Sequence, residues 1–365
     1  IHHTWYSIVH TSYNTRYKHN QVVKMRAVVV RELGPATSPQ SLHYETDYPE
    51  PKLITGHAIV RNEFSGINFI DTYHRSGLYP RSVPFICGQE GGGSIASISY
   101  GDDDVSEQEF KVGDRVVYAC FETYAEYTLV PTSKLIAVPE GMDIRTAITC
   151  MVQGLTAHYL VTSAHAQLVQ KSEWCLIYSV GSGTCQWAAQ MAKIRGYKVI
   201  GTCSKSKVEK ASAAGCDELI VLDEEEGKGY SDYKSVDMVG RIMSITKGQG
   251  VKCVIDGVGK STSDISLQCL ARRGIFVSFG NASGKVDDLS LLRLVGKSNF
   301  VTRPKLGDYV ATRDELLQRM NEVFEWVQNG NLEVCVDQEF DLSDAVKGHQ
   351  YIEAGKSKGK LLLKI

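Results

Sequence analysis

The spacing of hydrophobic and polar positions changes repeatedly along the chain, and the clearest unit lies at residues 174–207. A short apolar run from Trp174 to Val180 predicts a buried strand. Gly181-Ser-Gly183 then predicts a tight turn, Gln186 to Arg195 has a helical pattern, and Lys198-Val-Ile-Gly201 predicts the next strand. A strand, a glycine turn and a helix N-terminus in this order form an element whose backbone N–H groups can bind a pyrophosphate.

The residues after the second strand indicate which dinucleotide this unit would bind. An acidic residue at this corner accepts hydrogen bonds from the ribose 2′-OH of NAD. This chain has Ser204, Lys205 and Lys207 there, which suit a 2′-phosphate and predict NADP(H). The glycine turn alone is equally compatible with an ordinary strand–turn–helix, because Cys185 or Gln186 stands where a third glycine would complete the fingerprint.

Strands and helices alternate around this unit, which predicts a Rossmann-type, doubly wound parallel sheet. Glycine turns at Gly257-Val-Gly259 and Phe279-Gly-Asn281 follow two of the strands, at the edge where such folds bind ligands. The expected strands are 175–180, 198–202, 219–222, 252–256 and 275–279, and the helices between them are 207–214, 237–246 and 261–271.

The flanking segments have a different pattern. Residues 25–150 contain many short alternating strands with glycine turns, which predict a partly open β-barrel-like domain. Residues 143–170 are helical, with a kink near Gly154. Beyond residue 304 we expect a helix at 312–328, a strand at 332–336, a helix at 343–353 and a last strand at 359–365 that returns to the first domain.

Composition adds few constraints. A chain of 365 residues fits two domains, and a formal net charge of −2 gives no reason to expect nucleic acid or an anionic membrane as partner. The ten cysteines include no C-x-x-C pair, so neither a zinc ribbon nor a disulfide framework is indicated, and a reducing compartment is expected. No apolar run approaches the roughly 20 residues of a membrane span.

Residues 1–24 differ from the rest because they contain basic and aromatic residues but no acidic one. A disordered extension and a targeting presequence both have this bias. A disordered extension predicts a cytoplasmic protein, whereas a targeting presequence predicts a mitochondrial one.

Several motifs from Met25 onward resemble the zeta-crystallin-like, zinc-independent quinone oxidoreductases of the medium-chain dehydrogenase/reductase superfamily. The resemblance implies a GroES-like catalytic domain formed by residues 25–150 and 304–365, around an NADP-binding Rossmann domain at 151–303. It also implies a homodimer, commonly formed by joining sheets edge to edge. The motifs are Gly66-Ile-Asn-Phe-Ile-Asp-Thr-Tyr73, Arg75-Ser-Gly-Leu-Tyr-Pro80, Gly113-Asp-Arg-Val-Val-Tyr118, Gly154-Leu-Thr-Ala157, Cys269 to Asn281 and Phe300-Val-Thr-Arg-Pro304.

The same stretches favour chemistry without zinc. Zinc-using relatives have a His in a Gly-His-Glu motif and a Cys before it, whereas this chain has Gly88-Gln89-Glu90 and Ile70-Asp71. Zinc needs imidazole, thiolate or carboxylate ligands, and a glutamine amide does not replace a neutral imidazole. We therefore expect NADPH as cofactor and no metal, and no alcohol oxidation through a zinc alkoxide.

The resemblance also implies the site residues. Asn68, Tyr73 and Tyr79 would lie near the nicotinamide, as candidate catalytic donors to a quinone or enone oxygen; the alternative is that the two tyrosines only pack a loop. The cofactor-binding residues implied are Phe69, Ile70, Asp71, Thr72, Tyr73, Thr156, Gly181, Gly183, Thr184, Ser204, Lys207, Phe279, Gly280, Asn281, Thr302 and Arg303.

Four positions depart from the family pattern, and together they predict weaker NADPH binding than is usual in the family. Cys185 replaces the last glycine of the turn, Leu222 a tyrosine, Gln153 a lysine and Gly355 an arginine. Cys185 raises a further hypothesis, since a helix N-terminus stabilises a thiolate. The alternative is a small buried side chain that packs the helix on the strand.

The resemblance implies an NADPH:quinone reductase that supplies a quinone with electrons or hydride. Two alternatives stay open at this stage. The first is NADPH-dependent reduction of the carbon–carbon double bond of α,β-unsaturated carbonyls, which needs the same hydride and oxygen-binding donor. The second is a non-catalytic, crystallin-like protein that binds NADPH or RNA, against which stands the absence of a basic stripe with interleaved aromatic residues in the sequence.

Overall fold

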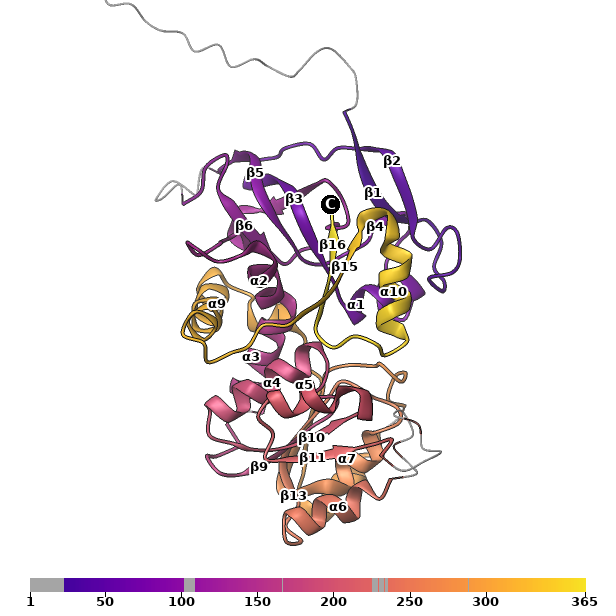
Figure 1. The fold of residues 1–365 in the computed structure, drawn as a ribbon, viewed down its shortest axis with the longest axis vertical. Helices are drawn as coiled ribbons and strands as arrows, with labels where there is room; N and C mark the ends of the chain where they lie inside the picture. The colour runs from indigo at the N-terminus through magenta and orange to yellow at the C-terminus, as the bar shows by residue number, and fades with distance from the viewer. Residues whose placement is uncertain are drawn as a thin grey trace, which may run out of the picture.

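The structure of the protein, a computed structural model, describes residues 23–365 apart from 102–108, 166, 225–228, 230–232, 234–235 and 288. The expectation for residues 1–24 therefore lies almost wholly outside the described residues. Figure 1 shows two bodies stacked along the long axis, with the parallel sheet below and the N-terminal strands above. The C-terminal strands lie in the upper body, beside strands from the start of the chain.

The lower body contains a six-stranded sheet in which every neighbouring pair is parallel, which confirms the doubly wound prediction. The chain proceeds outward from β9 in one direction and then restarts at β12 on the other side, so the switch point lies between these two strands. In order across the sheet the strands are β11 (Glu218–Val221), β10 (Lys198–Cys203), β9 (Trp174–Ile177), β12 (Val251–Asp256), β13 (Leu270–Ser278) and β14 (Phe300–Thr302).

Alternation along β9 shows why this sequence needs helices on both faces of the sheet. Cys175 and Ile177 pack in one core with α4 (Gly183–Ile194). Leu176 and its neighbour Tyr178 pack in a second core. Because successive strand residues point to opposite faces, one apolar run supplies both cores. The other sheet-covering helices are α5 (Val208–Ala213), α6 (Met238–Ile245) and α7 (Ser263–Cys269).

The upper body is built from two further sheets. A three-stranded sheet has the order β2 (His43–Pro49), β1 (Lys24–Val30), β4 (Phe85–Ile86). In the other, β16 pairs antiparallel with β3, so the last strand returns to the first domain as predicted. That sheet runs β15 (Val336–Asp341), β16 (Lys360–Lys364), β3 (His57–Ile67), β5 (Gly91–Ser99), β6 (Arg115–Tyr118), β8 (Ile136–Ala137), with β7 (Tyr127–Pro131) also on β3.

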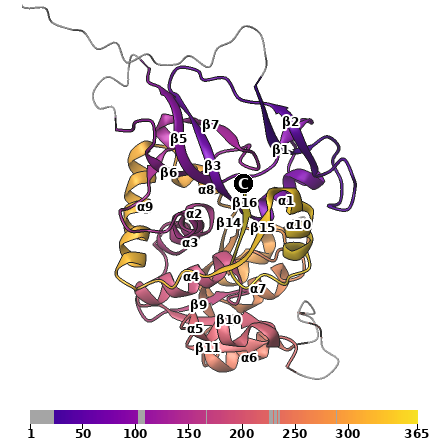
Figure 2. The same cartoon turned by 45° about the horizontal axis from the view of Figure 1, so that its top comes forward.

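A continuous helical column connects the two bodies. It begins as α2 (Ile144–Thr149), widens into a π-helical turn at Cys150–Gly154 and continues as α3 (Leu155–Thr162). The π-helical turn ends at the residue where the sequence predicts a kink. Figure 2 shows the long helix α9 (Arg313–Gln328) alongside this column. The remaining helices are α1 (Phe69–Ser76), α8 (Leu306–Tyr309) and α10 (Ala345–Glu353).

Two strand predictions were wrong in position. The chain leaves the sheet after Ile177, and Ser179 has φ 58°, a left-handed conformation that begins the turn. Near the C-terminus, Gly330 (φ 72°) follows α9, and residues 332–335 form no strand. Pairing with β16 starts only at Val336, which lies opposite Lys360. No helix in the described part of the chain has both the length and the apolar character to span a membrane.

Candidate active site

A cavity of about 1070 Å³ opens along the carboxyl edge of the parallel sheet, between the two bodies. The turns after β9, β10, β12 and β13 contribute Ser182, Ser204, Val258 and Gly280 to its wall. The opposite wall comes from α1, the π-helical turn, residues 304–311 and residues 352–359. Both bodies therefore enclose one cavity at the switch point of the sheet.

The turn after β9 is held by its own short polar side chains. Ser182 Oγ donates to the carbonyl of Ser179 at 2.8 Å, and the Ser179 N–H donates to Thr202 Oγ1 at 3.0 Å. Glycine is required at position 181 because a Cβ there would lie 2.6 Å from the Cβ of Lys207. The predicted pyrophosphate turn and the predicted 2′-phosphate lysine are thus packed directly against each other.

Lys207 lines the cavity together with Ser204. Burial lowers the pKa of the Lys207 ammonium, Asp337 opposes that change, and Lys358 lowers the pKa again. Desolvation is therefore the largest effect on this ammonium. An anionic ligand in the cavity would offset that cost.

At the other end, Asp71 organises the start of α1. Its Oδ2 accepts a hydrogen bond from the Asn68 N–H at 2.8 Å and another from Tyr124 Oη at 3.1 Å. Complete burial raises the pKa of Asp71 to about 7. Its carboxyl group is directed into the protein, so Asp71 fixes the backbone of Asn68 and does not line the cavity.

Two phenols, Tyr73 and Tyr79, form an edge-to-face pair on the cavity wall with ring centroids 5.3 Å apart. The Asn281 N–H donates to Tyr73 Oη at 3.0 Å. Asn281 Nδ2 and Arg303 Nη2 donate to Tyr79 Oη at 3.1 and 2.9 Å. Since both phenol oxygens act as acceptors within the protein, each O–H is left to donate to another oxygen. Burial raises the pKa of Tyr73 to about 12, which keeps that donor protonated at neutral pH.

Most of the predicted site residues lie together in this cavity. Asp71 and Thr72 lie on the buried side of α1, Asn281 and Arg303 support the phenols from behind, and Thr302 is paired with Val277 in the sheet. Those that line the cavity are Asn68, Phe69, Ile70, Tyr73, Tyr79, Thr156, Gly181, Gly183, Thr184, Ser204, Lys207, Phe279 and Gly280.

Three further residues of the cavity wall were not among the predicted site residues, although Gln153 and Gln89 stood out in the sequence as departures from the family pattern and from the zinc motif. Gln153 lies over the dinucleotide turn, since a Cβ on Gly183 would be 2.7 Å from its Nε2, and its Oε1 is buried without a partner among the described residues. The Nε2 of Gln89 is buried and unpartnered in the same sense. His74 also lines the cavity, with its ring against those of Tyr79 and Phe121. For the two glutamines the signal in the sequence was the departure from the residue that the family or the zinc motif would have there; His74 gave no such signal.

The reactive-thiol hypothesis for Cys185 was wrong. Its side chain is 7% exposed and packs in the core of α4. Burial raises the pKa of the thiol to about 12. Desolvation therefore outweighs the field of the helix N-terminus.

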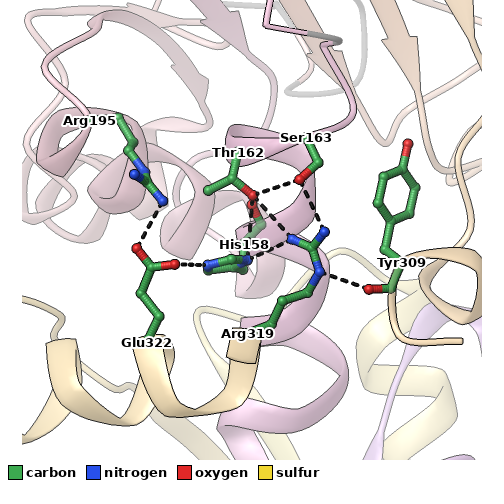
Figure 3. A network of polar contacts seen from close by, with 7 residues as sticks. All are labelled: His158, Thr162, Ser163, Arg195, Tyr309, Arg319 and Glu322. Atoms are coloured by element: carbon green, nitrogen blue, oxygen red, sulfur yellow. Dashed lines mark hydrogen bonds and ion pairs between the residues drawn. The ribbon is translucent and has the colours of Figure 1, made fainter. Parts of the chain in front are cut away.

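A polar network behind the cavity fixes the segment at residues 304–311 (Figure 3). Arg319 of α9 donates to the carbonyl of Tyr309 at 2.7 Å, to His158 Nδ1 at 3.1 Å and to Ser163 Oγ at 3.1 Å. The Tyr309 ring stacks on Tyr159, a cavity residue, with ring centroids 4.4 Å apart. The arginine thus connects the short helix α8 to α3.

The imidazole of His158 has a defined tautomer within this network. Because Nδ1 accepts from Arg319, the proton is on Nε2, which donates to Glu322 at 2.7 Å. Glu322 also accepts from Arg195 Nη2 at 2.8 Å. Burial lowers the pKa of His158, in keeping with a neutral ring. The network connects α3, α9 and residues 304–311 and so holds this part of the cavity wall.

No group of three or more His, Cys, Asp or Glu residues lies close enough to hold a metal ion within the ranges that the structure describes. Gln89 occupies the cavity wall at the position where the Gly-His-Glu motif would place its histidine. Glu90, the last residue of that motif, is completely buried.

Two family models match the chain. An alcohol dehydrogenase GroES-like domain covers residues 55–173, and a zinc-binding dehydrogenase domain covers residues 226–363. A quinone oxidoreductase of Pseudomonas aeruginosa is 35% identical over 325 residues, which are 88% of this chain and 93% of that protein. The 2-haloacrylate reductase of a Burkholderia species is 32% identical, over 84% of this chain and 90% of its own.

Solved structures agree with these matches. The Escherichia coli quinone oxidoreductase complexed with NADPH is 34% identical, with a TM-score of 0.82 over 94% of this chain and 99% of that one. Fold and cavity together define a medium-chain dehydrogenase/reductase, with a Rossmann sheet and a GroES-like body. Within that class the chain belongs to the quinone oxidoreductase family, a family of oxidoreductase enzymes, as the sequence motifs predicted.

Proposed function

We propose that this enzyme reduces quinones with NADPH and without zinc. The observation that carries the proposal is the pair of phenols, Tyr73 and Tyr79, on the wall of a cavity that reaches the dinucleotide turn. NADPH, when bound, supplies the hydride. The chain's own task is to bind both reactants, exclude water and donate hydrogen bonds to the acceptor oxygen.

The phenols suit that task because each oxygen already accepts a hydrogen bond within the protein and its O–H can still donate one. Asn281 and Arg303 use the lone pairs of the phenol oxygens, which leaves the O–H groups to a ligand. A quinone oxygen gains negative charge during reduction, so donors directed at it stabilise the transition state more than the ground state.

Three features support NADPH as the cofactor. The turn at 179–183 lies at the switch point, where the helix N-terminus of α4 suits a pyrophosphate. Lys207 lines the cavity, and burial lowers the pKa of its ammonium although Asp337 opposes that change. The amide of Gln153, with its unpartnered Oε1, faces the same cavity. Phe69 to Tyr73, Thr156, Phe279 to Asn281, Thr302 and Arg303 would hold or support the remainder of the molecule.

Zinc independence is part of the proposal, although one matching family model is described as a zinc-binding dehydrogenase. Gln89 offers an amide where a zinc enzyme would need an imidazole. The neighbouring carboxylate, Glu90, is engaged by other residues, and Asp71 is directed away from the cavity. These residues do not form a zinc-ligand set.

Reduction of α,β-unsaturated carbonyls is the second candidate. The match to a 2-haloacrylate reductase favours it, since that name describes an activated alkene as substrate. The same donors and the same hydride serve both reactions, so the cavity accommodates either.

We further propose a homodimer that joins two copies at β14, the edge strand of the parallel sheet. Phe300 and Val301 of that strand are 43% and 37% exposed, and Leu291, Leu292 and Val295 of the adjoining helical segment Leu291–Lys297 are 70–81% exposed. An open strand edge with apolar residues favours pairing with an identical strand.

Two expectations from the sequence remain predictions. One is the division of the domains at residues 151 and 304. The other is a cytoplasmic location, with the mitochondrial alternative.

The experiment is a fluorescence titration with NADPH and separately with NADH, followed by steady-state turnover with 1,2-naphthoquinone and with an α,β-unsaturated aldehyde. We expect tighter binding of NADPH and faster turnover of the quinone. Faster turnover of the aldehyde would favour the second candidate. If neither nucleotide binds, the enzymatic proposal fails, and salt-dependent RNA binding becomes the next measurement.

A further inference from the structure

A buried ion pair lies directly behind the cavity wall at Asn68. Glu90, just before β5, and Lys360, the first residue of β16, are both 0% exposed, and their side chains are in contact. Glycine at position 66 makes room for them, because a Cβ there would lie 2.7 Å from Lys360 Cε. In β16 the next residue, Leu361, pairs with Ile67, which brings Lys360 beside Asn68.

The ion pair and the amide form a closed ring of hydrogen bonds. Lys360 Nζ donates to Asn68 Oδ1 at 3.0 Å, and Asn68 Nδ2 donates to Glu90 Oε1 at 2.7 Å. Turning the amide over would place its NH₂ against the ammonium and its oxygen against the carboxylate. The charges therefore permit a single orientation of the Asn68 side chain.

That orientation leaves one amide hydrogen for a ligand. The second N–H of Nδ2 has only a long contact of 3.4 Å, to the carbonyl of Gly66, and Asn68 lines the cavity. The ring thus fixes the direction of this N–H without using it in a short hydrogen bond.

The other carboxylate oxygen of Glu90 holds the backbone of the helical column. Glu90 Oε2 accepts from the Val152 N–H at 2.7 Å, within the π-helical turn Cys150–Gly154. The next residue is Gln153, which lies over the dinucleotide turn. One carboxylate thus holds the Asn68 side chain and the backbone that carries Gln153.

A buried ion pair has a large desolvation cost, so stability alone does not explain it here. Desolvation of two charges can exceed their attraction, and apolar side chains of similar volume often serve stability equally well. We infer that Glu90 and Lys360 are positioning residues for the reduction, which hold Asn68 so that its second N–H, which makes only the long contact to Gly66, donates to a carbonyl oxygen in the cavity. The inference rests on the proposed function, and the carbonyl is either that of the acceptor or that of the nicotinamide carboxamide.

The test is a double-mutant cycle on turnover with NADPH and 1,2-naphthoquinone. Asn68→Ala and Lys360→Met are each expected to lower kcat/KM by about tenfold to a hundredfold, the range for a hydrogen bond that involves a charged group. If Lys360 acts through Asn68, the double variant is no slower than Asn68→Ala alone. Fold-reductions that multiply in the double variant would overturn the inference, and so would an unchanged rate in Lys360→Met.

Two further variants separate positioning from simple loss of stability. Glu90→Gln with Lys360→Met removes both buried charges, so it remains testable if the single variant fails to fold; it should show the same loss of rate with a near-normal melting temperature. Lys364→Met, at an exposed position of the same strand, is the matched control and should behave as wild type. Weaker NADPH binding in Lys360→Met would assign the carbonyl to the nicotinamide, and an unchanged dissociation constant with slower turnover would assign it to the acceptor. Absence of wild-type turnover would instead refute the proposed function.

Discussion

Replacement of Lys207 by Met tests whether this enzyme distinguishes NADPH from NADH at the corner after β10. Lys207 lines the cavity, and its Cβ packs against the turn at Gly181. Methionine keeps most of the volume and apolar stem but removes the charge. The expected result is weaker binding of NADPH and little change for NADH, because NADH has no 2′-phosphate.

The size of the effect follows from the environment of the ammonium. Burial and the charge of Lys358 both lower the pKa of Lys207, so the ammonium is less well solvated than a surface lysine. A hydrogen bond to a charged group contributes about 1.5–3 kcal/mol. Since about 1.4 kcal/mol is a factor of ten, NADPH affinity should fall roughly 10- to 150-fold. Lys358 remains and retains part of the preference.

The assay is a pair of titrations, with NADPH and with NADH, on the wild type and on two variants. Lys205→Met is the comparison variant: the sequence grouped Lys205 with Lys207 at the 2′-phosphate, but the structure leaves Lys205 exposed and outside the cavity lining. It removes the same charge from the surface and should change NADPH binding by less than about twofold, as expected for screened charges. Equal losses for both nucleotides, or equal losses in both variants, would refute the assignment of Lys207 to the 2′-phosphate.

Three other perturbations test separate parts of the structure. Between about pH 4 and 7 the Asp71 carboxyl group is protonated in the folded protein and ionised in the unfolded chain. The free energy of unfolding should therefore fall as pH rises through that window, by up to about 4 kcal/mol. Urea unfolding of Asp71→Asn should show no such pH dependence. If the proposed dimer forms at β14, Phe300→Lys should yield monomers in sedimentation, whereas Val112→Lys, at another exposed position, should not change the oligomeric state. Arg319→Met removes the hydrogen bonds to Tyr309, His158 and Ser163 and should lower the melting temperature by roughly 2–4 °C for each kcal/mol lost. An unchanged value would show that the network is dispensable.

The sequence predicted those parts of the protein that depend on local pattern. A single run, Trp174 to Val180, indicated a strand with two buried faces, and the structure has a core on each side of it. The glycine turn at 181–183 and the position of Lys207 after the next strand were also predictable, because both belong to one strand–helix–strand unit. Ser179 was misplaced in the strand because its left-handed φ of 58° has no signature in the residue type.

Residues far apart in sequence could not be paired in this way. Lys360 is 270 positions from Glu90, and it reads as an ordinary lysine at the start of a terminal strand. Arg319 and His158 are separated by 161 positions. Their hydrogen bonds depend on how two sheets and a helical column pack together, which no local periodicity encodes. Cys185 illustrates the same limit, since its pKa is determined by burial in a core that the sequence alone does not delimit.

The polar groups at the acceptor end of the cavity share one property that bears on its chemistry. The lone pairs of Tyr73 and Tyr79 are used by Asn281 and Arg303, and the oxygen of Asn68 is used by Lys360. What these three side chains still offer is hydrogen: two phenol O–H groups and one amide N–H. A ligand that presents oxygen lone pairs and becomes more negative during the reaction gains most from such a wall. Carbonyl compounds that accept a hydride fit this requirement.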